Sequence, residues 1–113
     1  MDIFQALADP TRRKIVEMLA DRGSLSATEI SDQFQISPQA ISQHLKVLRE
    51  AKLVQVEKRA QQRIYSVNSE TVFELEGWTR KLQQHWSERF EALDKVLEEE
   101  KRKAKGSVKD GNS

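Results

Sequence analysis

Four polar side chains in the middle of the chain have the types and the spacing to contact the edges of base pairs. They lie in SPQAISQHLKVLRE, residues 37–50, which opens with a serine N-cap and a proline at the first helical position. At about 100° per residue, Ile41, Leu45 and Leu48 gather on one side of this predicted helix. The other side then carries Gln39, Ser42, Gln43 and Lys46.

The chemistry of this polar side suits the major groove of DNA. A glutamine amide can bond N6 and N7 of an adenine together, serine can donate or accept, and lysine can reach a guanine or a phosphate. The small Ala40 lets the helix approach closely, and Ser37 stands at the helix start, where phosphate oxygens are favoured. His44 lies at the edge of the apolar side, where packing is the main alternative to a phosphate contact. A helix face can also be polar only because it keeps the protein soluble. The neighbouring segments must therefore distinguish a DNA-contacting face from a solvated one.

A β-hairpin is predicted directly after this helix. β-branched and aromatic residues partly alternate over residues 54–67, although the loop around residues 58–62 lacks the glycine that favours a tight turn. Lys58, Arg59 and Arg63 surround that turn. A basic hairpin beside such a helix would lie along the DNA backbone or in the adjacent minor groove.

The net charge of +1 conceals an uneven distribution along the chain. Residues 37–63 hold six basic and two acidic residues, a local charge of +4, whereas residues 1–36 and 69–103 each carry −2. A basic centre is a modest electrostatic footprint for a nucleic acid, and a solvated charged face is the alternative.

Short helices are predicted before residue 37. An apolar face at residues 3–7 indicates a first helix, and an Asp-Pro pair starts a second that ends near Gly23. The capping-box pattern at residues 26–29 starts a third helix, which we expect to end near Gln35. Only about two residues would then separate it from the polar-faced helix, a spacing typical of a helix-turn-helix.

A long helix is predicted from residue 68 or 69 to about residue 103, with apolar residues recurring at intervals of three and four. These residues form an apolar stripe along one side of the helix. A small core cannot cover a helix of this length, so part of the stripe should meet a second chain; the alternative is that the whole stripe packs within the monomer. We expect a homodimer whose interface includes Ile3, Phe4, Leu7, Leu75, Trp78, Leu82, Trp86, Phe90 and Leu93. Residues 1–103 would form one DNA-binding and dimerisation domain, and residues 104–113 a disordered tail.

Composition excludes several classes of function. The 113 residues contain no cysteine, so disulfides, thiolate metal sites and cysteine nucleophiles are absent. There is no glycine-rich phosphate loop, no recognisable pair of catalytic carboxylates and no plausible triad, so we do not expect an enzyme. No apolar run could span a bilayer and no signal-peptide pattern opens the chain, so we expect a soluble cytoplasmic protein without membrane insertion.

Four segments together resemble the ArsR/SmtB family of winged helix-turn-helix repressors. They are DPTRRKIVEML at 9–19, ATEISDQF at 27–34, SPQAISQHLKVLREAKLV at 37–54 and RIYSV at 63–67. The resemblance covers roughly residues 3–97. It implies a mainly α fold with a small β-hairpin, in which four helices, two strands and a fifth helix follow one another and the terminal helices hold a dimer.

The resemblance also implies a function. It predicts a homodimeric repressor of bacterial transcription that binds double-stranded DNA at a palindromic operator and associates with the nucleoid when bound. Residues 37–50 correspond to the recognition helix of the family and residues 54–67 to its wing. Lys52 departs from the family, because many members carry glycine there to adopt a left-handed backbone conformation.

The sensing residues of many family members are missing. Residues 27–34 contain no Cys-x-Cys pair, and the last helix has a single histidine, His85, near Glu88 and Asp94. We therefore expect no metal and no cofactor, as in the metal-independent, autorepressor-type (SdpR-like) members. The alternatives are a metal-responsive repressor with histidine and carboxylate ligands on the last helix, and a winged module that binds protein and no DNA. A small molecule or a protein could serve as inducer.

Overall fold

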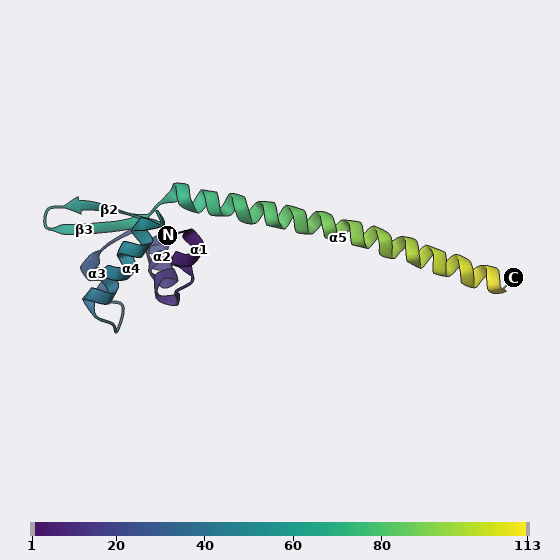
Figure 1. Ribbon diagram of the computed structural model, residues 1–113, viewed down its shortest axis with the longest axis horizontal. Coiled ribbons are helices and arrows are strands. Elements are labelled where there is room, and N and C mark those ends of the chain that lie inside the picture. Colours follow the sequence, from purple (N-terminus) through teal and green to yellow (C-terminus); the bar gives the residue numbers. More distant parts are fainter. Residues whose placement is uncertain (1, 113) are drawn as a thin grey trace. The chain divides into compact units, whose positions relative to one another are not determined.

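The helix-start signals of the sequence divide the N-terminal part of the chain into short elements. The computed structural model describes the backbone of residues 2–112 and the side chains of residues 2–104. The chain divides into two units, Met1–Glu74 and Leu75–Ser113. In chain order the elements are α1 (Ile3–Leu7), α2 (Pro10–Arg22), β1 (Ser24–Ser26), α3 (Ala27–Ser31), α4 (Pro38–Glu50), β2 (Val54–Arg59), β3 (Gln62–Val67) and α5 (Ser69–Asn112) (Figure 1).

The predicted helix caps are confirmed. The Asp9 carboxylate accepts the backbone N–H of Arg12 at 3.0 Å and so starts α2. At α3, the Ser26 hydroxyl accepts the N–H of Glu29 at 3.1 Å, and the Glu29 carboxylate accepts the N–H of Ser26 at 3.0 Å. Gly23 ends α2 with a φ of 87°, a conformation that residues with a Cβ rarely adopt.

The helix before the turn is shorter than the sequence predicted. α3 ends at Ser31 rather than near Gln35, because the backbone tightens after it. The N–H of Gln33 donates to the carbonyl of Ile30 at 3.1 Å, three residues back. Residues 32–37 therefore connect α3 to α4, a longer link than the two residues expected.

The sheet has three strands rather than the predicted two. β1 pairs antiparallel with β3, with Leu25 opposite Tyr65, and the strand order is β1-β3-β2. The segment Ser-Leu-Ser is too short to show an alternating pattern, so its strand conformation depends on β3 beside it. Ser26 ends this strand and at once caps α3, which ties the sheet to the helix-turn-helix. Figure 1 shows the hairpin of β2 and β3 projecting beyond the short helices.

One apolar core joins the helices of the first unit to the sheet. Ile15 on α2, Ile30 on α3 and Leu48 on α4 are each fully enclosed. The ring of Tyr65 on β3 is also buried. Because α4 contacts α2, α3 and β2, its orientation is set by this core. The buried apolar residues are Ala6, Ile15, Leu19, Leu25, Ile30, Ile41, Leu45, Leu48, Ala51, Leu53, Val54 and Tyr65.

α5 starts where the Asn68 side-chain oxygen accepts the N–H of Glu70 at 3.2 Å. The helix was expected to end near residue 103 and continues to Asn112. Side chains of residues 105–113 lie outside the part that the structure describes, so the disordered tail at 104–113 and the domain limits stay predictions. Although α5 is long, no helix in the described part of the chain is long and apolar enough to cross a membrane.

Candidate nucleic-acid interface

The orientation of α4 follows from its cap and its apolar side. The Ser37 hydroxyl accepts the N–H of Ala40 at 3.1 Å, and proline occupies the first helical position. Ile41, Leu45 and Leu48 are at most 2% exposed, which confirms the buried side predicted from their spacing. Burial of this side leaves the opposite side of α4 open to solvent.

The polar side of α4 is exposed along its length. Gln39, Ser42, Gln43 and Lys46 are all exposed, and Ala40 between them is half-buried. The described side chains provide no hydrogen-bond or ion-pair partner for the two glutamine amides or for the lysine ammonium. These donors and acceptors are available to an external ligand.

His44 faces a polar cluster that joins three helices. Its Nδ1 lies 3.4 Å from a terminal nitrogen of Arg12 and 3.9 Å from a carboxylate oxygen of Asp9. A guanidinium has only donors, so this contact requires Nδ1 to accept. A neutral His44 then carries its proton on Nε2, the nitrogen on the other side of the ring. The side chain is half-buried, which allows both packing against the core and a phosphate contact.

Arg12 is a residue that the sequence did not single out for this role. Its Nε donates to the carbonyl of Ala6 at 2.7 Å, and a terminal nitrogen donates to the carbonyl of Gln5 at 3.2 Å. Both carbonyls lie at the end of α1, where no further turn of helix follows, and that of Gln5 also accepts the N–H of the C-cap residue Ala8 at 3.3 Å. Through His44, the same guanidinium contacts α4, so one side chain links α1 to the polar-faced helix.

Asp9 completes the cluster as an ionised group. The backbone N–H of Arg12 that it accepts lowers the pKa of the Asp9 carboxyl below its ordinary value of 3.8. The charge of His44, when that ring is protonated, and the charge of Arg12 act in the same direction, while partial burial opposes them. A carboxylate therefore caps α2 and faces the histidine at neutral pH.

The register of the hairpin divides its basic residues between two faces. Lys58 lies directly opposite Arg63, on the same face as the buried Tyr65. Arg59 points to the other face, where it pairs with Glu57 at 3.5 Å. All the basic side chains of the hairpin are exposed. Two like charges directly opposite each other are unfavourable in the free protein.

The hairpin turn has two residues, and its strain lies at Ala60. β2 ends at Arg59 and β3 begins at Gln62. Ala60 has a φ of 54°, in the region that two-residue hairpin turns require and that glycine usually occupies. Lys52, after α4, has a φ of 62°, so the left-handed position expected from the family resemblance is confirmed.

The residues expected at a dimer interface differ in exposure. In the first unit, Ile3 and Leu7 are half-buried against the core, whereas Phe4 is 52% exposed. In the second unit, Leu75 is half-buried. The exposed members of the predicted set in that unit are Trp78, Leu82, Trp86, Phe90 and Leu93.

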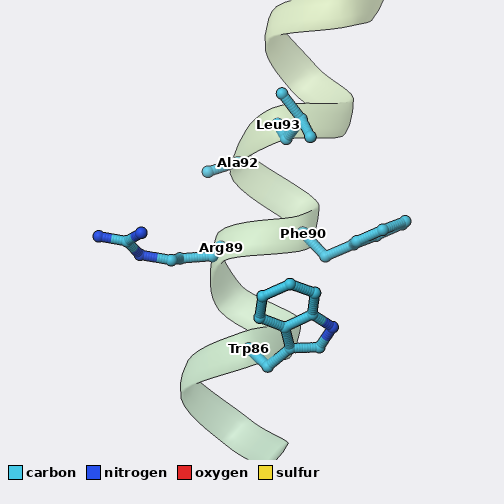
Figure 2. A pocket seen from close by; sticks show the side chains of 5 residues that line it. All are labelled: Trp86, Arg89, Phe90, Ala92 and Leu93. Carbon is cyan, nitrogen blue, oxygen red and sulfur yellow. The ribbon is translucent and has the colours of Figure 1, made fainter.

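A shallow hollow lies on the apolar stripe of the second unit. It is lined by Trp86, Arg89, Phe90, Ala92 and Leu93, all from consecutive turns of α5. Figure 2 shows the rings of Trp86 and Phe90 on one side of the helix and the Arg89 side chain on another. Val96 and Leu97, which were not in the predicted set, continue the exposed stripe.

Among the described side chains, no group of three or more histidine, cysteine, aspartate or glutamate residues lies close enough to hold a metal ion. The region around His85 on α5 forms no such cluster within one chain.

A helix-turn-helix followed by a β-hairpin, with an exposed polar helix face and basic residues on the hairpin, defines a winged helix-turn-helix DNA-binding protein.

Comparison with known proteins agrees with this class. A helix-turn-helix domain family matches residues 7–57. The transcriptional repressor SdpR of Bacillus subtilis is 35% identical over 77 residues, which cover 68% of this chain and 84% of SdpR. The HTH-type transcriptional regulator Rv2034 of Mycobacterium tuberculosis is 42% identical over 84 residues, covering 70% of this chain and 78% of that protein. An ArsR-like transcriptional regulator from Rhodococcus sp. RHA1 has a similar solved structure, with a TM-score of 0.71, 26% identity and coverage of 83% of this chain and 88% of that one.

The chain belongs to the ArsR family of winged helix-turn-helix transcriptional regulators. The resemblance found in the sequence is thereby confirmed. The relatives are DNA-binding regulators and not enzymes, which agrees with the lack of a catalytic constellation in the sequence.

Proposed function

We propose that this protein represses transcription as a homodimer that binds a palindromic operator without a metal cofactor. The observation that carries the proposal is the unpaired polar side of α4 next to the basic face of the hairpin. Repression follows if the operator overlaps a promoter and the bound dimer excludes polymerase. The protein would act in the cytoplasm, on DNA that includes the promoter of its own gene.

In this proposal α4 enters the major groove with its N-terminal half. Gln39 and Gln43 read adenine edges, and Ala40 packs against a thymine methyl group. Ser42 and Lys46 bond to base edges or to the nearest phosphates. Ser37 and His44 complete the DNA contacts of this helix with the sugar-phosphate backbone, the histidine through Nε2–H.

The hairpin adds contacts beside the groove. Lys58 and Arg63 share one face and would meet the phosphates nearest α4. Arg59 lies on the other face and would reach towards the adjacent minor groove. Its exposed pair with Glu57 costs little to break, because such pairs contribute at most about 1 kcal/mol.

The homodimer is supported by the apolar surface that each unit leaves open. Trp78, Trp86 and Phe90 are 47%, 69% and 59% exposed, which amounts to roughly 300–400 Å² from three side chains. That is already as large as the main apolar patch of a typical monomer. In the dimer these rings would join Leu75, Leu82 and Leu93 from α5. The face of α1 with Ile3, Phe4 and Leu7 would complete the interface.

Metal independence is supported by the donor set of the chain. The sequence has no cysteine and two histidines, and His44 faces the cation Arg12 and only one carboxylate, that of Asp9. Structural and regulatory zinc sites usually need about four nitrogen, oxygen or sulfur ligands. We propose that the inducing signal is a small molecule or a partner protein.

A footprint on the DNA upstream of the protein's own gene tests the proposal. The experiment is run at two salt concentrations, each with and without zinc. We expect a symmetric protected site whose affinity falls steeply with salt and does not respond to zinc. Two half-sites about one helical turn apart would match a twofold-symmetric dimer.

Any other footprint would change the proposed function. Release of the DNA by zinc would make the protein a metal-responsive repressor and would assign ligands to α5, beginning with His85. Absence of binding to any duplex, even at low salt, would defeat the proposal and favour a winged module that binds protein. Protection of an asymmetric single site would refute the palindromic operator.

A further inference from the structure

A cavity opens between the polar-faced helix and the hairpin. It has a volume of about 230 Å³, far more than one water molecule needs. Ser42, Lys46 and Arg49 line it from α4, and Arg63 and Tyr65 line it from β3. The hairpin therefore contributes to the same cavity as the helix, although Arg49 and Arg63 are fourteen positions apart along the chain.

The charges around this cavity are unbalanced. Within residues 2–104, none of the three cations has an acidic partner at ion-pair distance. The nearest acidic residue on the hairpin, Glu57, points to the other face and pairs with Arg59. Lys58 lies opposite Arg63 and adds to the positive field. Such a cluster is unfavourable when empty and becomes favourable when an anion enters it.

The donors match the geometry of a phosphate group. Each guanidinium presents a planar fork that can bond two phosphate oxygens, and the ammonium adds a mobile point charge. The Ser42 hydroxyl can donate one further hydrogen bond. The cavity lies on the flank of α4 that adjoins the exposed polar side, so a DNA strand lying along that side would bring its phosphates to it.

We propose that Lys46, Arg49 and Arg63 clamp one phosphate of the DNA backbone in this cavity. The clamp rests on the proposed function and adds Arg49 to the DNA contacts proposed for that function. By holding the same phosphate from the helix and from the hairpin, it fixes the position of the hairpin relative to the major groove. It contributes affinity for any sequence, because a phosphate carries no base identity.

The first test compares Arg49→Gln with Lys14→Gln on the operator duplex and on an unrelated duplex of equal length. Lys14 is an exposed cation on α2 outside the cavity. We expect Arg49→Gln to weaken binding roughly tenfold on both duplexes and to lower the salt slope by about one. Lys14→Gln should leave both quantities unchanged, and Arg49→Lys should restore the slope but only part of the affinity.

The second test locates the phosphate. Single phosphates of the operator are replaced in turn by uncharged methylphosphonates, and binding is measured for the parent protein, Arg49→Gln and Arg63→Gln. At one position in each half-site the replacement should weaken the parent roughly tenfold and should have no further effect on either variant. If the two variants lose their response at different positions, they do not share a phosphate and the clamp is refuted.

The outcomes separate this inference from the proposed function. If the parent binds DNA and Arg49→Gln binds with the same affinity and salt slope, the clamp is wrong and the repressor remains. If the parent binds neither duplex, the proposed function fails with it. If inorganic phosphate binds the free protein tightly while Arg49→Gln leaves DNA affinity unchanged, the cavity holds a free anion instead and the inference is overturned.

Discussion

Replacement of Trp86 by alanine should dissociate the proposed dimer without disturbing the core of the first unit. Trp86 lies in the second unit, and 69% of its surface is exposed in the single chain. A truncation there removes no buried contact from the core around Ile15 and Leu48. Its effect should therefore appear in the association of chains.

The size of the effect follows from the exposed area. A tryptophan side chain buries roughly 150–250 Å², so about 100–170 Å² of Trp86 remains for an interface. Complete burial of this area contributes about 2.5–4 kcal/mol at ~25 cal/mol per Å². If the partner covers only half of this area, each truncated copy loses half of that free energy. The two copies in a dimer together then lose the full amount. The dissociation constant should rise roughly 100- to 1,000-fold.

Sedimentation equilibrium over a wide range of protein concentration measures this shift. Phe73→Ala is the matched control, because Phe73 is also an aromatic residue of α5 and is 67% exposed, but helical spacing puts it on the opposite side from the stripe. The control should keep the dissociation constant of the parent within a few-fold.

Two results would refute the reasoning. An unchanged dissociation constant for Trp86→Ala would mean that the stripe of α5 is not the interface. Equal dissociation of Trp86→Ala and Phe73→Ala would mean that association depends on the stability of α5 and not on one of its faces.

Four further changes test the site and the fold. Gln43→Ala should cost about 1–3 kcal/mol of binding free energy on the preferred operator and little on other DNA. If the variant ranks a panel of operator variants in the same order as the parent does, this prediction is wrong. Arg12→Ala should lower the stability by about 1–2 kcal/mol in urea unfolding, and Arg12→Lys should not restore it, since a lysine cannot bond the carbonyls of α1 and His44 together. Asp9→Ala should cost about 1 kcal/mol at pH 7, because the cap is lost. The lowered pKa of Asp9 makes its contribution fully present above pH values around 3.8 and lost as the pH falls further, so parent and variant should converge in acid unfolding curves. Lys52→Gly should raise the melting temperature, with a gain of about 0.5–1 kcal/mol, because the φ of 62° suits glycine; a lower melting temperature would show that the lysine side chain stabilises the fold in another way.

The ArsR-family assignment and the helix faces could be read from the sequence because they depend on local rules. The cap at Asp9, the capping box at Ser26 and the buried side of α4 each involve residues within one or two helical turns. The left-handed Lys52 was likewise indicated by a single position of the family pattern. The short length of α3 could not be read from the sequence. The residues after Ser31 have similar local preferences for a helix and for the tight turns that replace its end.

The sequence by itself determined where the helices begin, which side of α4 is polar and that the middle of the chain is basic, because these depend on residue type and on spacing within one element. Only the tertiary structure decided that β1 pairs with β3, that Arg12 of α2 reaches His44 of α4, and that Arg63 of β3 shares a cavity with Arg49. The register of the hairpin, which separates Arg59 from Lys58 and Arg63, also belongs to this second group. Each of these depends on contacts between residues far apart in the chain, and such contacts are fixed by the packing of the core and not by local preference.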